Sequence, residues 1–340
     1  MNSNMAFYAV QTKITAKKGY ISKSLNLDNI LECSTVEQLR SLLLNNKEFE
    51  RIFLAAKSDN INRDSFEAIL GRFTTIEIED LLHYFSGHYK DFIEELLIES
   101  EIKDISLILR KIAKQESLEG IENRFVHSNR YATLNFDKLL TSKNVHRFTE
   151  NLKGTPYYTG LKNLTEEDAV KREFHIEMKL YVEFSKRLME KSENLNKEDR
   201  EAVKDIIGLK IDLLNVQWIN RALNYYKLSP EEVLFYSLVG GSSMDYKQLK
   251  KLCYSKSYDE FRKLVKSYIG IEVSKKKGKT GNVNYYLYDY LKKEKFKNIG
   301  IAISYIYLID IITDDIITIA EGIKYEAPKE QILDYLSYSK

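Results

Sequence analysis

Proline, the residue that most often interrupts α-helices, is almost absent from this chain. Its 340 residues include three prolines, at positions 156, 230 and 328. Because proline lacks the N–H group that an intrahelical hydrogen bond requires, the long intervals between them leave helix formation unopposed. Apolar residues within those intervals recur at the 3.6-residue period of a helix and show no comparable strict alternation, so the sequence predicts an all-α fold. Two such runs are Phe66, Ile69, Leu70, Phe73 and Ile76, and Ile206, Ile207, Ile211, Leu214 and Trp218.

Short polar segments indicate where helices begin and where the chain breaks. A serine or threonine followed three residues later by an acid is typical of a helix N-terminus, and proline is tolerated in the first turn. Breaks are expected where glycine, serine and lysine cluster, at residues 153–156, 240–243 and 274–281. The predicted helix starts are Ser34 with Glu37, Thr165 with Asp168, and Ser229 with Pro230 and Glu232.

One pattern recurs three times, in approximate repeats that span residues 1–128, 129–240 and 241–340. Each repeat opens with two adjacent apolar residues, and five positions after them a second apolar segment begins. A unit of about a hundred residues is far longer than the repeats of solenoid proteins, so it predicts three similar helical lobes in a pseudo-threefold arrangement. The residues are Ile30, Leu31, Val36 and Leu39; Leu139, Leu140, Val145 and Phe148; and Leu252, Cys253, Tyr258 and Phe261.

Later in each repeat, a helix carries an acid, apolar residues one and four positions on, and a base nine positions on. At about 100° per residue the apolar positions share one face, whereas acid and base lie on opposite sides and cannot pair. We expect the apolar face to be core, with the acid toward the start of the helix and the base toward its end, as the helix dipole favours. The three helices contain Glu101, Ile102, Ile105 and Arg110; Asp212, Leu213, Val216 and Arg221; and Asp315, Ile316, Ile319 and Lys324.

The charge and cysteine content argue against several classes of protein. Lys and Arg number 52 against 50 Asp and Glu, so the net charge of +2 lacks the excess that phosphate neutralisation by a nucleic-acid-binding protein requires. The two cysteines, Cys33 and Cys253, form no C-x-x-C pair and support neither a disulfide framework nor a zinc site. A reducing cytoplasm fits this content best.

No segment predicts export or membrane insertion. Residues 1–21 lack the apolar centre of a signal peptide. The most apolar stretch, residues 299–312, contains Asp310, is followed by Asp314 and Asp315, and falls short of the ~20 residues that a spanning helix needs. We expect a cytoplasmic protein that is peripheral to the membrane through a partner.

The sequence predicts no catalytic residue, no cofactor-binding residue and no metal ligand. The glycines of residues 240–243 lack the lysine and the spacing of a phosphate-binding loop, so a turn is expected there. The lysine run at 275–279 is expected to be a surface loop, and the acid pairs at 94–95 and 166–167 to be solvated. The tyrosines of residues 285–290 and 305–307 suit either core or interface. The histidines lack the i, i+4 spacing of a helical metal site and are expected to be satisfied or at the surface: His83, His88, His127, His146 and His175.

Two longer segments resemble signatures of the C subunit of V-type rotary ATPases, the counterpart of the eukaryotic d subunit. Residues 212–233 (DLLNVQWINRALNYYKLSPEEV) are similar to its central signature and residues 316–333 (IITIAEGIKYEAPKEQIL) to its closing one. The threefold repetition resembles that family as well, so the resemblance covers nearly the whole chain. Two departures from the family are visible. Lys13 and Lys17 stand where such proteins tend to carry arginines, and the first repeat lacks the segment with proline and glutamate that follows the base in the other two.

The resemblance implies a cone-shaped or funnel-shaped protein of three helical lobes with no catalytic chemistry of its own. Such a protein sits on the membrane rotor ring, built of K subunits, and receives the central axle, built of the D and F subunits; contact with the stator I subunit is left open. It would couple the axle to the ring for ion transport through the stiffness of its packed body. The transported ion, proton or sodium, and the direction, ATP synthesis or hydrolysis, stay open.

Two alternative functions follow from the residues without the resemblance. An unrelated helical scaffold or adaptor would also lack catalytic groups, but its repeats would be about 34 to 47 residues long. An enzyme such as a helical hydrolase would need a deep polar pocket that holds several acids of shifted pKa.

Overall fold

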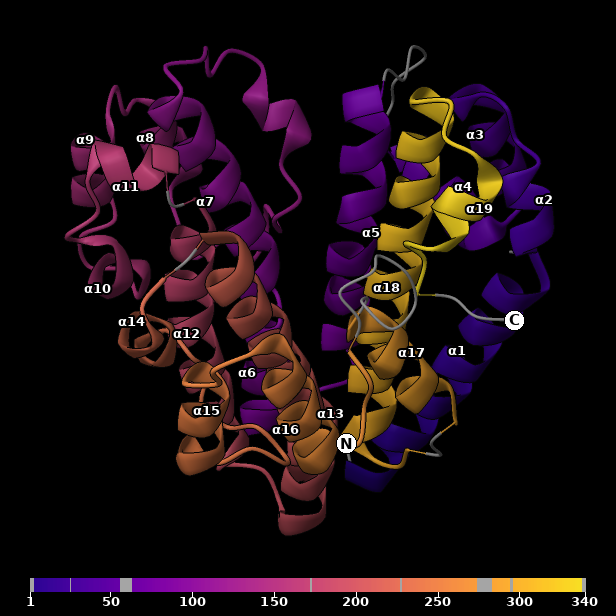
Figure 1. Cartoon of the computed structure of the whole chain (residues 1–340). Coiled ribbons are helices and arrows are strands. Elements are labelled where there is room, and N and C mark those ends of the chain that lie inside the picture. The colour runs from indigo at the N-terminus through magenta and orange to yellow at the C-terminus, as the bar shows by residue number, and fades with distance from the viewer. Residues whose placement is uncertain are drawn as a thin grey trace.

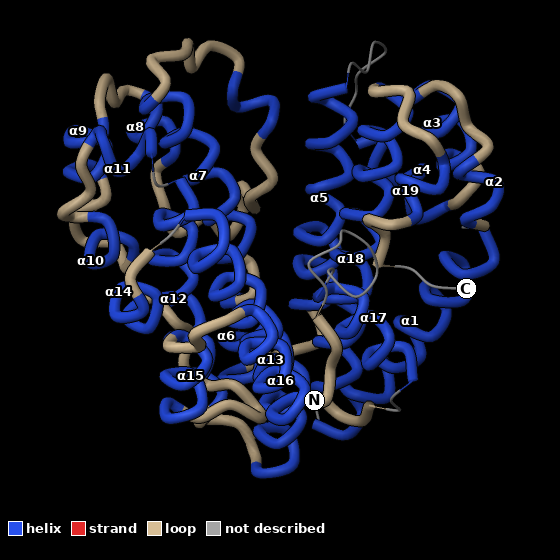
Figure 2. Tube along the Cα trace, in the orientation of Figure 1, coloured by secondary structure: helices blue, strands red, loops and turns tan. Residues whose placement is uncertain are grey.

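Helices form every regular element that the computed structural model assigns within residues 3–24, 26–55, 63–171, 173–226, 228–273, 283–293 and 296–337, the part of the chain that it describes (Figure 2). The prediction of an all-α fold is therefore confirmed. The elements are α1 (Ser3–Ser24), α2 (Leu27–Leu31), α3 (Val36–Leu44), α4 (Lys47–Ala55), α5 (Arg63–Leu82), α6 (Gly87–Glu95), α7 (Ile98–Ala113), η1 (Ile121–Arg124), α8 (Phe136–Leu140), α9 (Val145–Asn151), α10 (Tyr157–Leu161), α11 (Glu166–Lys171), α12 (Glu173–Ser192), α13 (Lys197–Arg221), η2 (Ala222–Tyr226), α14 (Pro230–Phe235), α15 (Tyr246–Cys253), α16 (Tyr258–Ile269), α17 (Val283–Lys293), α18 (Ile299–Lys324) and α19 (Lys329–Leu333).

The helices form two groups that lie side by side and diverge from a shared base (Figure 1). One group contains α1 to α5 together with α17 to α19, and the other contains α6 to α16. The first and last parts of the chain therefore fold together. The groups meet where α18 packs against α13, close to the base.

The long helix α18 forms the centre of the first group. It contains the most apolar stretch of the sequence, and most of its side chains, among them Ile303 and Tyr305, are buried against α5, α1 and α13. Among the described helices, none combines the length and the apolar character that crossing a bilayer would require. The apolar stretch is therefore a core helix.

Two of the three predicted helix starts are confirmed. The Thr165 hydroxyl accepts from the N–H of Asp168 at 3.1 Å, and the Ser229 hydroxyl accepts from that of Glu232 at 3.2 Å. The prediction of Ser34 is wrong by one residue, because Thr35 caps α3. Its hydroxyl accepts from the N–H of Gln38, whose side chain in turn accepts from the N–H of Ser34. Glutamine completes this reciprocal pair as an acid would.

The three repeat openings fold alike. In each, the first apolar pair ends one short helix and the second apolar segment begins the next, from α2 to α3, from α8 to α9 and from α15 to α16. A side-chain cap precedes the second helix in every case, from Thr35, Asn144 and Ser257. The sequence repeat thus corresponds to a recurring pair of helices, whereas the boundaries at 128 and 240 and the three-lobe arrangement stay predictions.

The acid-to-base pattern lies on α7, α13 and α18, and its apolar positions are core as predicted. The exposed fraction of these side chains is 2% or less: Ile102 1%, Ile105 0%, Leu213 2%, Val216 0%, Ile316 2% and Ile319 1%. The three bases lie in the last turn of their helices, which is the end of the dipole that favours a cation.

The dipole interpretation of the acids is wrong for Asp212 and Asp315, which lie in the interiors of their helices. All three acids are buried, and each accepts a hydrogen bond from the backbone N–H of a loop residue further along the chain. Buried backbone donors need a partner, and a carboxylate supplies one where water is excluded. The donors are Thr133 to Glu101 at 2.6 Å, Ser243 to Asp212 at 2.7 Å and Ser337 to Asp315 at 2.9 Å.

A second tie follows three residues later on α7 and α13. The Asp104 carboxylate accepts from the backbone N–H groups of Val126 and His127, at 2.9 and 2.8 Å. The Asn215 amide exchanges two hydrogen bonds with the backbone of Leu238, at 2.8 and 2.9 Å. These helices therefore hold the loops that leave their own repeats.

Candidate functional site

The histidines are structural or exposed residues, as predicted, wherever their side chains are described. His127 is buried, with its Nδ1 atom 2.7 Å from the Asp104 carboxylate and its ring stacked on Phe136 at 3.7 Å between centroids. His83, His88 and His146 are exposed, and the side chain of His175 lies outside the described residues. In the described ranges, His, Cys, Asp and Glu form no group of three that could hold a metal ion.

The glycine segment at 240–243 is a turn, as predicted, and it closes around Asp212. Gly240 has a φ of +98°, and a Cβ atom on Gly241 would lie 2.0 Å from Oδ1 of Asp212. Burial raises the pKa of Asp212 to about 6, against the opposing effect of the Ser243 N–H. The backbone of this segment therefore binds a carboxylate of the protein itself. The lysine run at 275–279 and the break at 274–281 lie outside the described residues.

Of the predicted solvated acids, Glu95 proves to be buried. Its side chain is 2% exposed, and its carboxylate pairs with Arg187 at 2.9 Å and with Lys191 at 2.7 Å, both on α12. Two cations on the neighbouring helix replace the water that a charged carboxylate needs, so the prediction fails for this residue. Glu166 and Glu167 are exposed as expected.

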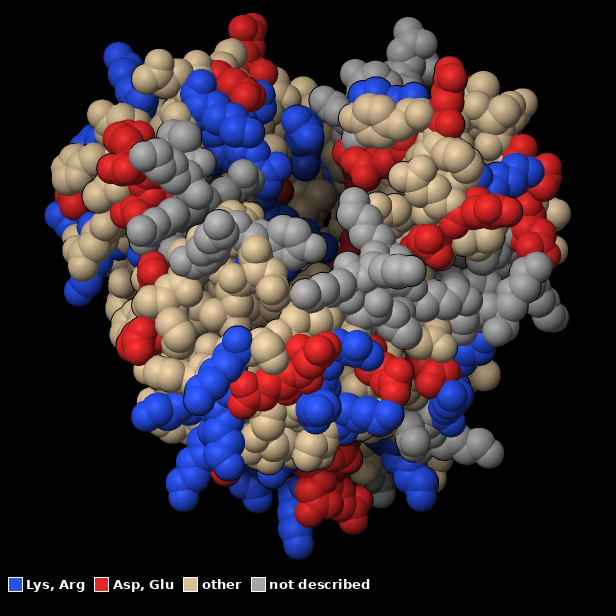
Figure 3. All heavy atoms as spheres, in the orientation of Figure 1, with Lys and Arg blue, Asp and Glu red and all other residues tan. Residues whose placement is uncertain are grey.

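A hollow between the two groups of helices is the main concave feature of the face seen in Figure 3. It reaches down to a pocket where α5, α7 and α18 come together. Polar and charged side chains from three distant parts of the sequence line this pocket: Thr74, Thr75, Glu99, Ser100, Lys103, Tyr307 and Asp310.

One ion pair crosses the floor of the hollow. The Nζ atom of Lys103 on α7 lies 3.1 Å from the Asp310 carboxylate on α18, and the Thr74 hydroxyl on α5 donates to the same carboxylate at 3.5 Å. Asp310 raises the pKa of Lys103 above its usual range. The Lys103 side chain is 42% exposed, so water reaches this pair from the hollow.

A second ion pair lies beside the first one. The Nζ atom of Lys210 on α13 lies 2.7 Å from the Glu99 carboxylate and 4.0 Å from the centre of the Tyr307 ring. The hydroxyl of Tyr181 donates to the same carboxylate at 2.9 Å. Burial lowers the pKa of Lys210, but Glu99, Tyr307 and Asp310 together outweigh this effect, so the pKa is raised overall. Four charges from three helices therefore balance one another at the floor.

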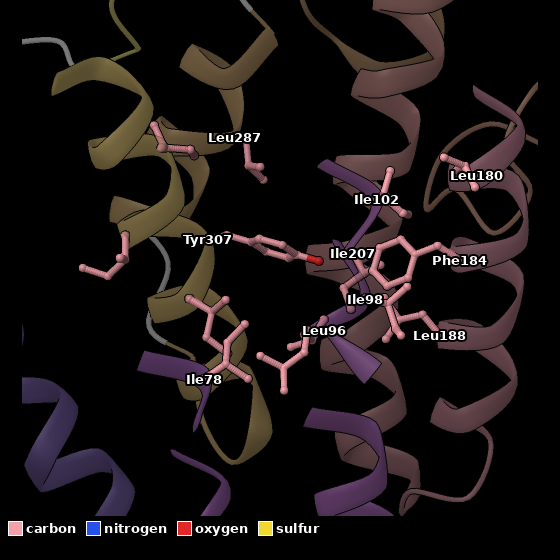
Figure 4. Close-up of a cluster of buried hydrophobic side chains, with 14 of the residues drawn as sticks. Ile78, Leu96, Ile98, Ile102, Leu180, Phe184, Leu188, Ile207, Leu287 and Tyr307 are labelled. Atoms are coloured by element: carbon pink, nitrogen blue, oxygen red, sulfur yellow. The ribbon is translucent and has the colours of Figure 1, made fainter. Parts of the chain in front are cut away.

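A packed apolar layer supports these charges. In Figure 4, Tyr307 extends from α18 toward Leu96, Ile98 and Ile207, which belong to the other group of helices. All four side chains are buried. The two groups are thus joined by interdigitated side chains as well as by ion pairs. Tyr305 and Tyr307, for which the sequence left core or interface open, both lie in this core.

The sequence pointed to Asp310 as a charge within an apolar stretch but predicted none of the residues that surround it. Lys103 lies two positions after the acid of its repeat, whereas Lys210 and Asp310 lie two and five positions before theirs. The repeat pattern therefore gave no signal that could have linked them. All are already paired, which suits a rigid binding surface better than acid–base catalysis, where a free group must exchange protons.

The hollow and its three central helices belong to a chain that matches a known family almost throughout. The family model described as ATP synthase (C/AC39) subunit matches residues 10–335. The chain belongs to this family. The resemblance to the C subunit of V-type rotary ATPases is therefore confirmed.

Two relatives support the same family. The chain is 29% identical to the C subunit of the A-type ATP synthase of Archaeoglobus fulgidus over 137 residues, which cover 40% of this chain and 37% of that protein. It is 24% identical to the corresponding A-type ATP synthase protein of Methanosphaera stadtmanae over 225 residues, 64% of this chain and 56% of that protein. The matched segments thus span about a third to a half of the relatives' lengths.

Proposed function

We propose that this member of the ATP synthase C/AC39 family is a non-catalytic part of the central stalk. It links the axle, made of the D and F subunits, to the membrane rotor ring of K subunits, so that rotation and ion transport stay coupled. The observation that carries the proposal is the hollow between two groups of helices, which is open at one end and closed by a packed floor at the other.

A coupling protein must transmit torque without yielding, and the contacts at the base of this chain favour stiffness. Asp199 at the start of α13 is fully buried. Its carboxylate accepts from the Tyr89 hydroxyl at 2.6 Å and from the N–H of Ile299 at 3.1 Å. One side chain thus connects α6, α13 and α18. Hydrogen-bonded, close-packed interiors are poorly compressible, so movement at one group is passed to the other.

The proposed arrangement places the axle in the hollow and the ring against the closed end. The chain would be peripheral to the membrane and would reach it through the ring, with the stator I subunit as a possible neighbour. Charge pairs that are already satisfied at the floor suit this role, because they hold the shape of the socket rather than act on a substrate.

The test is to remove this protein from membranes that carry the complex and to measure ATP hydrolysis and ion uptake together. We expect hydrolysis by the soluble head to continue while ion uptake stops, and both to be coupled again when the purified chain is added back. The purified chain should bind no ATP in equilibrium dialysis. If ion uptake remains coupled to ATP hydrolysis without this protein, the proposed link between axle and ring is contradicted, and a scaffold or adaptor is favoured instead.

A further inference from the structure

Three aromatic side chains, which we call the aromatic patch, lie exposed on α14 and α15. Phe235 on α14 is 77% exposed, more than any other large apolar side chain in the described part of the chain. Tyr246 begins α15 and Tyr254 follows its end, and both are exposed. The Tyr254 hydroxyl donates to Glu231 at 2.8 Å, and Glu231 lies one turn before Phe235 on the same side of α14. The two helices therefore present one continuous aromatic surface.

Lysines surround the aromatic patch. Lys250 stands midway between the two tyrosines, with its Nζ atom 5.8 Å from the centre of the Tyr254 ring, and Lys247 and Lys251 flank it. All three lysines are exposed, and none forms an ion pair with an acid among the described residues. Residues 245–269, which include α15 and α16, hold seven Lys and Arg against three Asp and Glu, a net charge of +4 in a chain whose total is +2. Blue atoms accordingly gather at the lower left of Figure 3, in the region of α15.

The composition of this surface favours a lipid bilayer over a protein partner. Protein interfaces are enriched in arginine and depleted of lysine, whereas six of the seven cations in residues 245–269 are lysines. A lysine has a flexible stem, which can cover apolar surface while its ammonium group follows a mobile headgroup. Tyrosine is enriched where a membrane meets water, because its ring is apolar and its hydroxyl stays hydrated. Exposed aromatic rings among unpaired lysines therefore complement anionic headgroups above an apolar layer.

We propose that the aromatic patch and the lysines of α15 and α16 bind the surface of an anionic lipid bilayer directly. These helices lie near the base of the molecule, where the two groups of helices meet (Figure 1). The proposed function places this closed end against the membrane rotor ring, which would bring the lysines toward the lipid beside the ring. Such a contact is shallow and combines buried apolar area with attraction to anionic lipids. The inference goes beyond the proposed function, in which the chain reaches the membrane through the ring alone.

The experiment is flotation of the purified full chain with vesicles of phosphatidylcholine alone and of phosphatidylcholine mixed with phosphatidylglycerol. We expect the chain to float with the anionic vesicles only, and to dissociate from them as salt is raised, because salt screens the lysines. Lys250→Gln should lower the partition coefficient about fivefold, the effect of one cation near an anionic surface. Phe235→Ser changes no charge and should lower it about tenfold through lost apolar burial.

Matched controls are Lys143→Gln, at an exposed residue just before α9, and Leu54→Ser, at an exposed residue of α4. Both should leave flotation unchanged, and circular dichroism checks the fold of all four variants. The proposal is overturned if the chain binds neither vesicle or binds both equally, or if the patch variants behave like the controls. It is also overturned if Phe235→Ser weakens binding to the isolated K ring but not to lipid, since the patch is then a protein interface. The assay of coupled hydrolysis and ion uptake tests the socket separately.

Discussion

The backbone N–H of Ser243 donates a 2.7 Å hydrogen bond to Oδ2 of Asp212, a residue in the interior of the long helix α13. Asp212 is fully buried, so hydrogen bonds from one loop replace the water molecules that would otherwise hydrate its carboxylate. The same relationship joins Glu101 on α7 to Thr133. An acid in the interior of a helix therefore fixes the chain that leaves its repeat, and this tie makes stability sensitive to pH and to the space around the carboxylate.

The first prediction concerns pH. Burial raises the pKa of Asp212 to about 6, above the value of about 3.9 for an unfolded aspartate. The folded state then binds the proton more tightly, so the stabilisation by protonation is complete below about pH 4 and is lost as pH rises through about 6. Between about pH 5 and about pH 7 the free energy of unfolding should fall by about 1 kcal/mol on this account.

Urea unfolding at both pH values, for the unaltered chain and for Asp212→Asn, measures this contribution. The variant cannot ionise at this position, so its stability should lack that component of the pH dependence. Equal pH dependence in the two proteins would mean that Asp212 does not titrate in this range.

The second prediction concerns Gly241. A Cβ atom there would lie 2.0 Å from Asp212 Oδ1, so Gly241→Ala must displace the loop and should reduce the free energy of unfolding by about 1 to 3 kcal/mol. Gly19 lies in α1, where a Cβ atom meets nothing within 4 Å. Gly19→Ala should therefore be neutral or stabilise by up to about 1 kcal/mol. Thermal unfolding of both variants decides, and equal effects would refute the close contact.

The third prediction tests the apolar face of the acid-to-base helices. Ile319 on α18 is 1% exposed, and Ile319→Ala should cost about 2 to 4 kcal/mol through lost burial and the cavity left behind. Leu54 is 69% exposed, and Leu54→Ala should change stability by less than about 0.5 kcal/mol. Chemical denaturation gives both values. A small effect at Ile319 would show that this face is not core.

The fourth prediction concerns a buried charge cluster on α5. The Glu77 carboxylate is fully buried and pairs with Lys17 at 2.7 Å, with Arg51, and with the hydroxyl of Tyr305 at 2.7 Å. Glu77→Ala would remove the acceptor of the Tyr305 hydroxyl and leave Lys17 and Arg51 with Glu48 and Asp80 as their carboxylate partners, and it should cost about 3 to 5 kcal/mol. Tyr305→Phe removes one hydrogen bond and should cost about 1 kcal/mol.

Denaturation in low and in high salt provides the check for this cluster. Buried pairs are screened far less than surface pairs, so the cost of Glu77→Ala should hardly change with ionic strength. A cost that disappears in high salt would place the cluster in contact with solvent.

The sequence by itself determined the helical class, the core faces and the family. The scarcity of proline and the 3.6-residue apolar period together favour helices over the long intervals between the prolines. The apolar residues that recur at the same spacing in each repeat correctly predicted the paired helices. Helix period is a local property, because neighbours along a helix are fixed by geometry within one or two turns. The same locality explains why Thr165 and Ser229 were identified as caps, and why Ser34 was wrong by one residue only.

Only the tertiary structure decided what the charges do. Asp212 and Asp315 carry no sequence signal that distinguishes a buried tie from a charge at a helix end, since the loop that each one binds lies more than 20 residues away. Lys103 and Asp310 are separated by 207 positions and meet only because α7 and α18 face each other across the hollow. The energy of a charge depends on its distance from other charges and from water, and folding alone sets those distances.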